Sequence, residues 1–153
     1  MMNEYFSADK ALSMVIGGLT DIISVYGIFL EKLSNRTLWY QYNDLYQEQK
    51  EMKNQLINRF RALYPEEDPV VPAQFGARIP APDELRGLSA PETLKLLNSV
   101  HTPAIDLFED ISLRCEDPIS GEFIHITADR MHANRMRFMK DIHLNSRHDD
   151  YFH

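Results

Sequence analysis

Two carboxylate–imidazole pairs follow each other toward the C-terminal end of the sequence. Glu122 and His125 form the first pair and Asp129 and His132 the second, each with a three-residue spacing. Residues three apart share one face of a helix, and helical bundles present ligands to two iron ions in this way. His125, Asp129 and His132 would lie on one helix edge, beside the apolar stripe. With Glu109 of the preceding helix, they predict a site for iron or another divalent metal, or alternatively a solvated polar rim.

A second group of polar residues interrupts faces that are otherwise apolar. His101 falls within the apolar stripe of the predicted third helix, and Gln49 and Lys53 fall within that of the second. Arg135 occupies a similar position in the fourth helix. Buried polar groups in proteins are hydrogen-bonded, so we expect His101 to bond Gln49, a backbone carbonyl or water. We interpret these four residues as a structural core polar layer; a ligand-binding or proton-transfer role for His101 is the alternative.

The longest apolar run, Ala11–Leu33, is the element around which the other helices must pack. Its apolar residues recur at three- and four-residue steps, which predicts a buried helix. Ser7 is a plausible N-cap, and Asn35 could end the helix in a left-handed conformation. A second helix is expected over about residues 37–64. Because the connection between them is short, the two helices should form an antiparallel hairpin.

A proline-rich segment, residues 66–88, follows this hairpin and should be a crossover without regular helix. The third helix should start at the capping box that begins with Ser89, and Pro103 should kink or split it. Asp117 is a plausible cap for the fourth helix, although Gly121 weakens the start and could delay it to Glu122.

The expected ending is a frayed tail over residues 145–153. The predicted fold is an all-α, antiparallel four-helix bundle with one long crossover, and residues 1–153 form a single domain.

Composition excludes several function classes. The 153 residues carry a net charge of −7, which argues against nucleic acid as the main partner. Cys115 is the single cysteine, so we expect no internal disulfide and, by default, a reducing cytoplasm. The sequence has no glycine-rich phosphate loop and no G-x-S-x-G motif. We therefore assign no catalytic residues.

The apolar run also has to be weighed as a membrane span. Ala11–Leu30 barely reaches the ~20 apolar residues that spanning requires, and Asp21 in its middle would cost roughly 3 kcal/mol. Charged residues follow at once. The first ten residues also lack a basic leader. We expect neither a membrane span nor a signal peptide.

The stretch LTDIISVYGIFLEKLSNRTLWYQYNDLYQEQKEMKNQL is similar in its helical rhythm to small, metal-poor members of the ferritin-like bundle superfamily. The resemblance extends in layout over about residues 8–144. It implies a hairpin, a crossover and two more helices, and a metal site with an inward carboxylate on each helix. This chain departs from that pattern: the first helix offers Tyr26 inward, the second Gln49, and the third His101 with Glu109 at its edge. About half of the ligands of a two-iron centre are missing.

The first predicted helix has a second apolar edge, formed by Met14, Gly18, Val25 and Ile28. A soluble monomer seldom exposes such a patch, so a protein partner, a second copy of the chain or the crossover should cover it. We therefore expect a non-enzymatic interaction protein, such as an adaptor, small chaperone, inhibitor or assembly subunit, that binds through this helix. The alternative is a ferritin-like metal-binding protein or oxidase.

Overall fold

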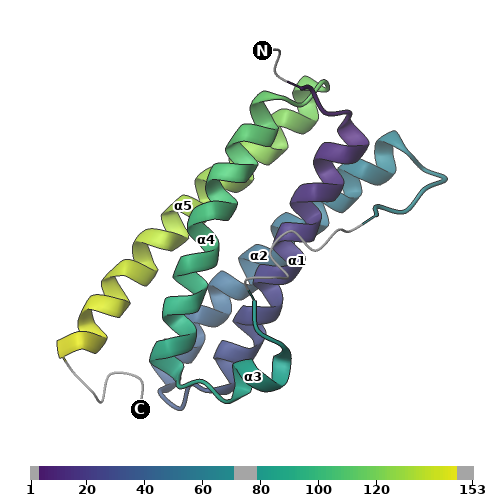
Figure 1. The fold of residues 1–153 in the computed structure, drawn as a ribbon. Helices are drawn as coiled ribbons and strands as arrows, with labels where there is room; N and C mark the ends of the chain where they lie inside the picture. The colour runs from purple at the N-terminus through teal and green to yellow at the C-terminus, as the bar shows by residue number, and fades with distance from the viewer. Residues whose placement is uncertain (1–3, 71–78, 148–153) are drawn as a thin grey trace.

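The computed structural model describes residues 4–70 and 79–147, with side chains as far as residue 144. These ranges hold α1 (Ala8–Glu31), α2 (Arg36–Leu63), α3 (Pro82–Arg86), α4 (Ala90–Leu113) and α5 (Pro118–Arg147). The only β-type pairing among the described residues is an isolated bridge between Phe6 and Cys115. Figure 1 shows the four long helices lying side by side along most of their lengths, with short α3 at one end. The expected all-α fold class is confirmed.

The first helix, α1, is the centre of the packing and contacts α2, α3, α4 and α5. Ser7 caps it as predicted, with its side chain accepting a hydrogen bond from the backbone N–H of Lys10. Leu12, Ile16 and Leu19 of its inner stripe are fully buried. By length and composition α1 could also cross a membrane, but 67% of its most apolar window is buried inside the chain. A core helix passes the same test, and the absence of a span stays a prediction.

The first hairpin joins α1 to α2, which run in opposite directions (Figure 1). Asn35 acts differently from the prediction. It has a φ of −71° and accepts a hydrogen bond from the backbone N–H of Leu38, so it caps the start of α2. A short polar side chain serves either purpose. The extended backbone of Asn35, directly before Arg36, is that of an N-cap. Pro65 lies just beyond the end of α2, as expected.

The second hairpin joins α4 to α5, which also run in opposite directions (Figure 1). Ser89 caps α4 as predicted. The helix continues past Pro103, so this proline does not split it, and the alternative of a kink stays a prediction. The fifth helix starts at Pro118, directly after Asp117, and not near Glu122.

Gly121 does not delay the start of α5. A Cβ atom at this position would lie only 2.9 Å from the carbonyl oxygen of Ser112, so glycine permits the close approach of α4 and α5. At its other end α5 extends to Arg147, and residues 145–147 of the expected tail are therefore helical. Residues 148–153 lie outside the described residues.

The crossover returns from the end of α2 to the start of α4, and its described parts dock on α1. Near one end of α1, the Tyr64 hydroxyl oxygen accepts a hydrogen bond of 3.3 Å from the backbone N–H of Asp9. Near the other, Lys32 Nζ donates to the carbonyl oxygens of Arg86 and Leu88. Residues 71–78 lie outside the described residues.

The short helix α3 was not predicted in this segment. Its sequence signal is a proline in the first turn followed by two acidic residues, with Arg86 at its end. Leu85 is 1% exposed, so burial of one leucine fixes this single turn against α1. Proline therefore begins a helix here, in the first turn, where the backbone N–H groups have no partner within the helix and the missing N–H costs little.

Candidate functional site

The predicted metal ligands on α5 do not come together. His125 Nε2 lies 3.4 Å from Asp129 Oδ2, and both side chains are more than half exposed. His132 is exposed further along α5, and Glu109 is exposed on α4. In residues 4–70 and 79–147, no three histidine, cysteine or acidic side chains are grouped so that they could hold a metal ion. The structure thus brings two of the four predicted ligands together as a surface pair.

The predicted core polar layer is divided between the interior and its edge. His101 and Gln49 are both fully buried, as expected. Lys53 and Arg135 are only half-buried, and Arg135 Nε donates to the hydroxyl of Thr102 at 2.8 Å. The prediction that Lys53 and Arg135 lie in the core is therefore wrong. A long basic side chain can bury its stem and still keep its charge near water.

His101 pairs with α1 and not with Gln49. Its Nε2 lies 3.3 Å from the hydroxyl of Tyr26, and its ring packs edge-on against Tyr26 and Phe138. Burial lowers the pKa of His101 to about 3, while the nearby carbonyl of Met131 acts in the opposite direction. The imidazole is consequently neutral at pH 7, as a histidine enclosed by aromatic rings should be.

A second buried network, which sequence reasoning missed, connects α2 to α5. The Tyr42 hydroxyl donates to the carboxylate of Asp141, which is 1% exposed. Arg137 Nε lies 3.3 Å from the same carboxylate, and Arg137 also donates to Gln41. The sequence signal was the four-residue spacing of Arg137 and Asp141. The network pairs a buried charge, which would otherwise destabilise the fold.

The second apolar edge of α1 is covered within the single chain. Val25 is fully buried, Ile28 is 6% exposed, and Gly18 is also buried. Met14 is half-buried. We expected this edge to be covered, and residues of the same chain cover most of it. A partner could reach Val25 and Ile28 only after the chain had opened, so this edge is not a free docking surface.

Four of the large apolar side chains that are exposed among the described residues lie instead around the connection between α4 and α5. They are Leu113 (81% exposed), Tyr5 (64%), Ile119 (57%) and Ile126 (47%). Three adjoining shallow pockets cover this region, and the most apolar of them is lined by Pro118, Ile119, Glu122, Phe123 and Ile126. We call Tyr5, Leu113 and these five lining residues the turn surface.

Polar contacts between neighbouring residues hold the turn surface in place. Arg59 of α2 forms an ion pair of 2.7 Å with Asp117, and Asp117 also accepts hydrogen bonds from the backbone N–H and hydroxyl of Ser120. The Arg59 and Ser120 hydrogen bonds lower the pKa of Asp117 to about 2. These contacts fasten the first turn of α5 to α2, which fixes the direction in which Ile119 projects.

The N-terminal segment braces the same connection. The backbone N–H of Phe6 donates to the carbonyl of Arg114 at 2.7 Å, and the N–H of Glu116 donates to the carbonyl of Phe6 at 2.8 Å. The intervening Cys115 is half-buried, and burial raises the pKa of its thiol. A protonated, partly buried thiol is a packing group and a poor nucleophile.

The rim of the turn surface is acidic. Glu109, Glu116 and Glu122 are exposed, and the structure shows no ion pair to any of them in the part of the chain that it describes. The nearby cations are already engaged, since Arg59 pairs with Asp117 and Arg114 pairs with Asp110. The sequence carried a signal for the apolar part: Ile119, Phe123 and Ile126 recur at four and three residues.

Comparisons with known proteins leave the family open. No family model matches the sequence, and no curated protein is significantly similar to it. Among solved structures, the hypothetical protein Pfu-1136390-001 from Pyrococcus furiosus has a similar fold, with a TM-score of 0.71 at 14% sequence identity. The similarity covers 91% of this chain and 90% of that chain. At this identity it shows a shared all-helical fold alone, and the ferritin-like assignment is not established.

Proposed function

We propose that the chain is a non-enzymatic interaction protein that binds a protein partner through the turn surface. The single observation that carries this proposal is the gathering of four well-exposed apolar side chains at one end of the molecule. Exposed apolar residues scattered singly need no explanation, whereas a contiguous group with a polar rim is typical of an interaction site. Because Val25 and Ile28 are buried, the proposed docking site moves from α1 to the start of α5.

Two finer structural statements accompany this proposal. We infer that the helices form an antiparallel four-helix bundle with a ferritin-like layout. The two antiparallel hairpins and the long connection between α2 and α4 support this (Figure 1). We also infer a cytoplasmic location, which rests on the single cysteine.

The alternative function is a ferritin-like metal-binding protein or oxidase that uses iron or another divalent metal. The helical spacing of Glu122–His125 and Asp129–His132 favours it. Against it, the inward positions of α1, α2 and α4 hold Tyr26, Gln49 and His101, none of which is a carboxylate. A neutral amide and a phenol are weak substitutes for the carboxylates that hard cations prefer. The alternative stays a hypothesis, tested by metal analysis of protein purified without chelators.

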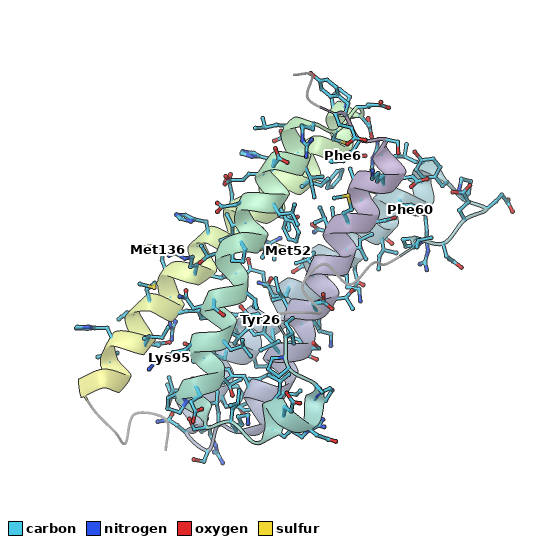
Figure 2. All side chains as sticks on the ribbon, in the orientation of Figure 1. Phe6, Tyr26, Met52, Phe60, Lys95 and Met136 are labelled. Atoms are coloured by element: carbon cyan, nitrogen blue, oxygen red, sulfur yellow. The ribbon has the colours of Figure 1, made fainter. Side chains whose placement is uncertain are left out.

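The test of the main proposal compares three baits in extracts of the native cell. One is the unaltered chain, one carries Ile119→Asp with Ile126→Asp, and one carries Met136→Asp with Met139→Asp. The methionines are the matched control, since they are 59% and 45% exposed on the same helix, and Met136 points away from the other helices in Figure 2.

We expect a set of proteins that the unaltered chain and the methionine variant retain and that the isoleucine variant loses. Circular dichroism must show equal helicity for all three baits. Identical sets retained by all three would contradict the proposal.

A further inference from the structure

We infer that the segment that docks on the turn surface is a cationic amphipathic helix of a different protein. This inference rests on the proposed function, because it names the occupant of the same surface. It follows from three properties of the described residues: the spacing of the exposed apolar side chains, the unneutralised acidic rim, and the effect of that rim on self-association.

The apolar side chains suit a helix. Ile119, Phe123 and Ile126 recur along two turns of α5, so they form a stripe parallel to the helix axis. Pro118 and Glu122 complete the lining of the shallow groove along this stripe. A partner helix with apolar residues at the same period can lay its stripe along it, which is the helix-in-groove mode of recognition. An extended peptide that binds by adding a strand needs a sheet edge, and within the described residues the chain offers only one isolated bridge.

The acidic side chains at the rim favour a partner segment with positive charge. Glu122 lines the groove itself, Glu116 lies in the connection just before α5, and Glu109 lies on α4 about one turn before Leu113. Each of the three is exposed and lacks an ion pair in the described chain. Lysine and arginine residues flanking the apolar stripe of a partner would neutralise them. The overall charge of −7 would also attract such a partner from a distance.

The same charges disfavour a second copy of this chain as the occupant. A two-fold contact would place the turn surface of one copy against the turn surface of the other. The acidic rim of one copy, with Glu109, Glu116 and Glu122, would then lie against the acidic rim of the other, and like charges opposed in this way weaken an interface. A different protein with the opposite charge meets no such penalty.

The probes for the test are two synthetic helical peptides with the same leucine stripe, one flanked by lysine and arginine and the other by glutamate. Binding is measured by fluorescence anisotropy at several salt concentrations, with the full chain. We expect the cationic peptide to bind at least about tenfold more tightly than the acidic one. We expect its affinity to fall as salt rises, because the rim charges are solvated.

Three variants locate the binding. Ile119→Asp with Ile126→Asp should abolish binding. Glu109→Gln, Glu116→Gln and Glu122→Gln together should weaken it about tenfold, as three surface pairs of ordinary strength would. Glu66→Gln, Glu67→Gln and Asp68→Asn together are the matched control, since these three acids are exposed but lie outside the turn surface. This control should leave binding unchanged.

Each contrary result identifies what has failed. If both peptides bind equally and both need Ile119 and Ile126, the docking surface stands and the cationic occupant is wrong. If the cationic peptide binds regardless of Ile119 and Ile126, or if the control acids matter as much as the rim, binding is general charge attraction. The inference then falls, and so does the evidence for the surface. Absence of binding by either peptide overturns the cationic helix, while the native-extract comparison still tests the surface.

Sedimentation at increasing protein concentration tests the remaining candidate for the occupant, which is a second copy of the chain. A dimer that Ile119→Asp dissociates would make the second copy the true partner and overturn the inference.

Discussion

Two helices of this protein carry a second apolar edge, and the two edges have opposite fates. On α1 the edge is buried, with Val25 fully enclosed and Ile28 6% exposed. On α5 the edge remains open, with Ile119 57% and Ile126 47% exposed. Both edges have helical spacing and similar side chains. The difference lies in what surrounds them. Helix α1 contacts all four other helices, whereas α5 contacts α1, α2 and α4 on its inner side.

The comparison shows what an amphipathic pattern means in a folded chain. Periodicity tells in which direction an apolar side chain projects from its helix. It does not tell whether another segment lies there. On α1 the pattern describes a core, and on α5 the same pattern describes a surface that can bind. Substitutions that introduce identical chemistry on the two edges therefore test the distinction directly.

The largest effect should come from Val25→Asp. A carboxylate at this fully buried position would have no partner, and an unpaired buried charge destabilises a fold by about 3 kcal/mol or more. We expect a large fall in the urea midpoint of unfolding, or failure to fold, with no change in assembly state at temperatures where the chain is folded. An unchanged midpoint would show that this edge is not enclosed in solution.

The next effect concerns His101 of α4, which packs against Tyr26 of α1. Its pKa is lowered to about 3 in the folded chain, against about 6.5 when unfolded. Above pH 6.5 the fold has full stability. As the pH falls from 6.5 toward 3, the unfolded chain gains a proton that the folded chain cannot, and stability falls by about 1.4 kcal/mol per pH unit.

His101→Gln should remove this slope while retaining a hydrogen-bonding group near Tyr26. The measurement is the urea midpoint at pH 7, 6, 5 and 4 for both chains. We expect the two curves to converge as the pH falls. If they stay parallel, His101 is accessible to protons in the folded protein, and the interior around α1 is more open than the structure indicates.

A smaller effect should follow from Asp117→Asn at the base of the exposed edge. The pKa of Asp117 is lowered to about 2 by Arg59 and Ser120, so its contribution is present above pH 4 and is lost as the pH falls through 2. Because the pair is partly exposed, we expect the variant to lose only about 1 kcal/mol at pH 7. Urea unfolding at pH 7 and pH 2 measures it, and the difference between the two chains should be much smaller at pH 2, where about half of the Asp117 carboxylates are protonated in the folded chain.

The smallest effect on stability should come from Ile119→Asp with Ile126→Asp. Both side chains are already largely in water, so the unfolding free energy should change by less than about 0.5 kcal/mol per site. A carboxylate that strongly destabilises the protein on the buried edge of α1 should change the unfolding free energy very little here. A loss of several kcal/mol, measured by urea unfolding, would mean that the exposed edge is covered in solution and would remove the turn surface as a docking site.

Local chemistry allowed several features to be predicted without the fold. Ser7 and Ser89 cap helices because a hydroxyl can bond a free backbone N–H wherever a helix starts. The burial of His101 followed from its place within an apolar stripe. In the candidate metal site, by contrast, only His125 and Asp129 meet, and they share a single helix. Ligands from different helices depend on the relative rotation and offset of those helices, which spacing within one helix does not contain.

The sequence by itself determined where the four long helices lie and which face of each is apolar, because hydrogen bonding within a helix and side-chain periodicity are local properties. Only the tertiary structure decided which residues of different helices contact one another. It paired His101 with Tyr26 across 75 positions of sequence, enclosed Val25, and left Ile119 in water. The physical reason is that burial is a property of neighbouring segments: an apolar side chain contributes to stability only where another element covers it, and at the start of α5 the described chain provides no such cover.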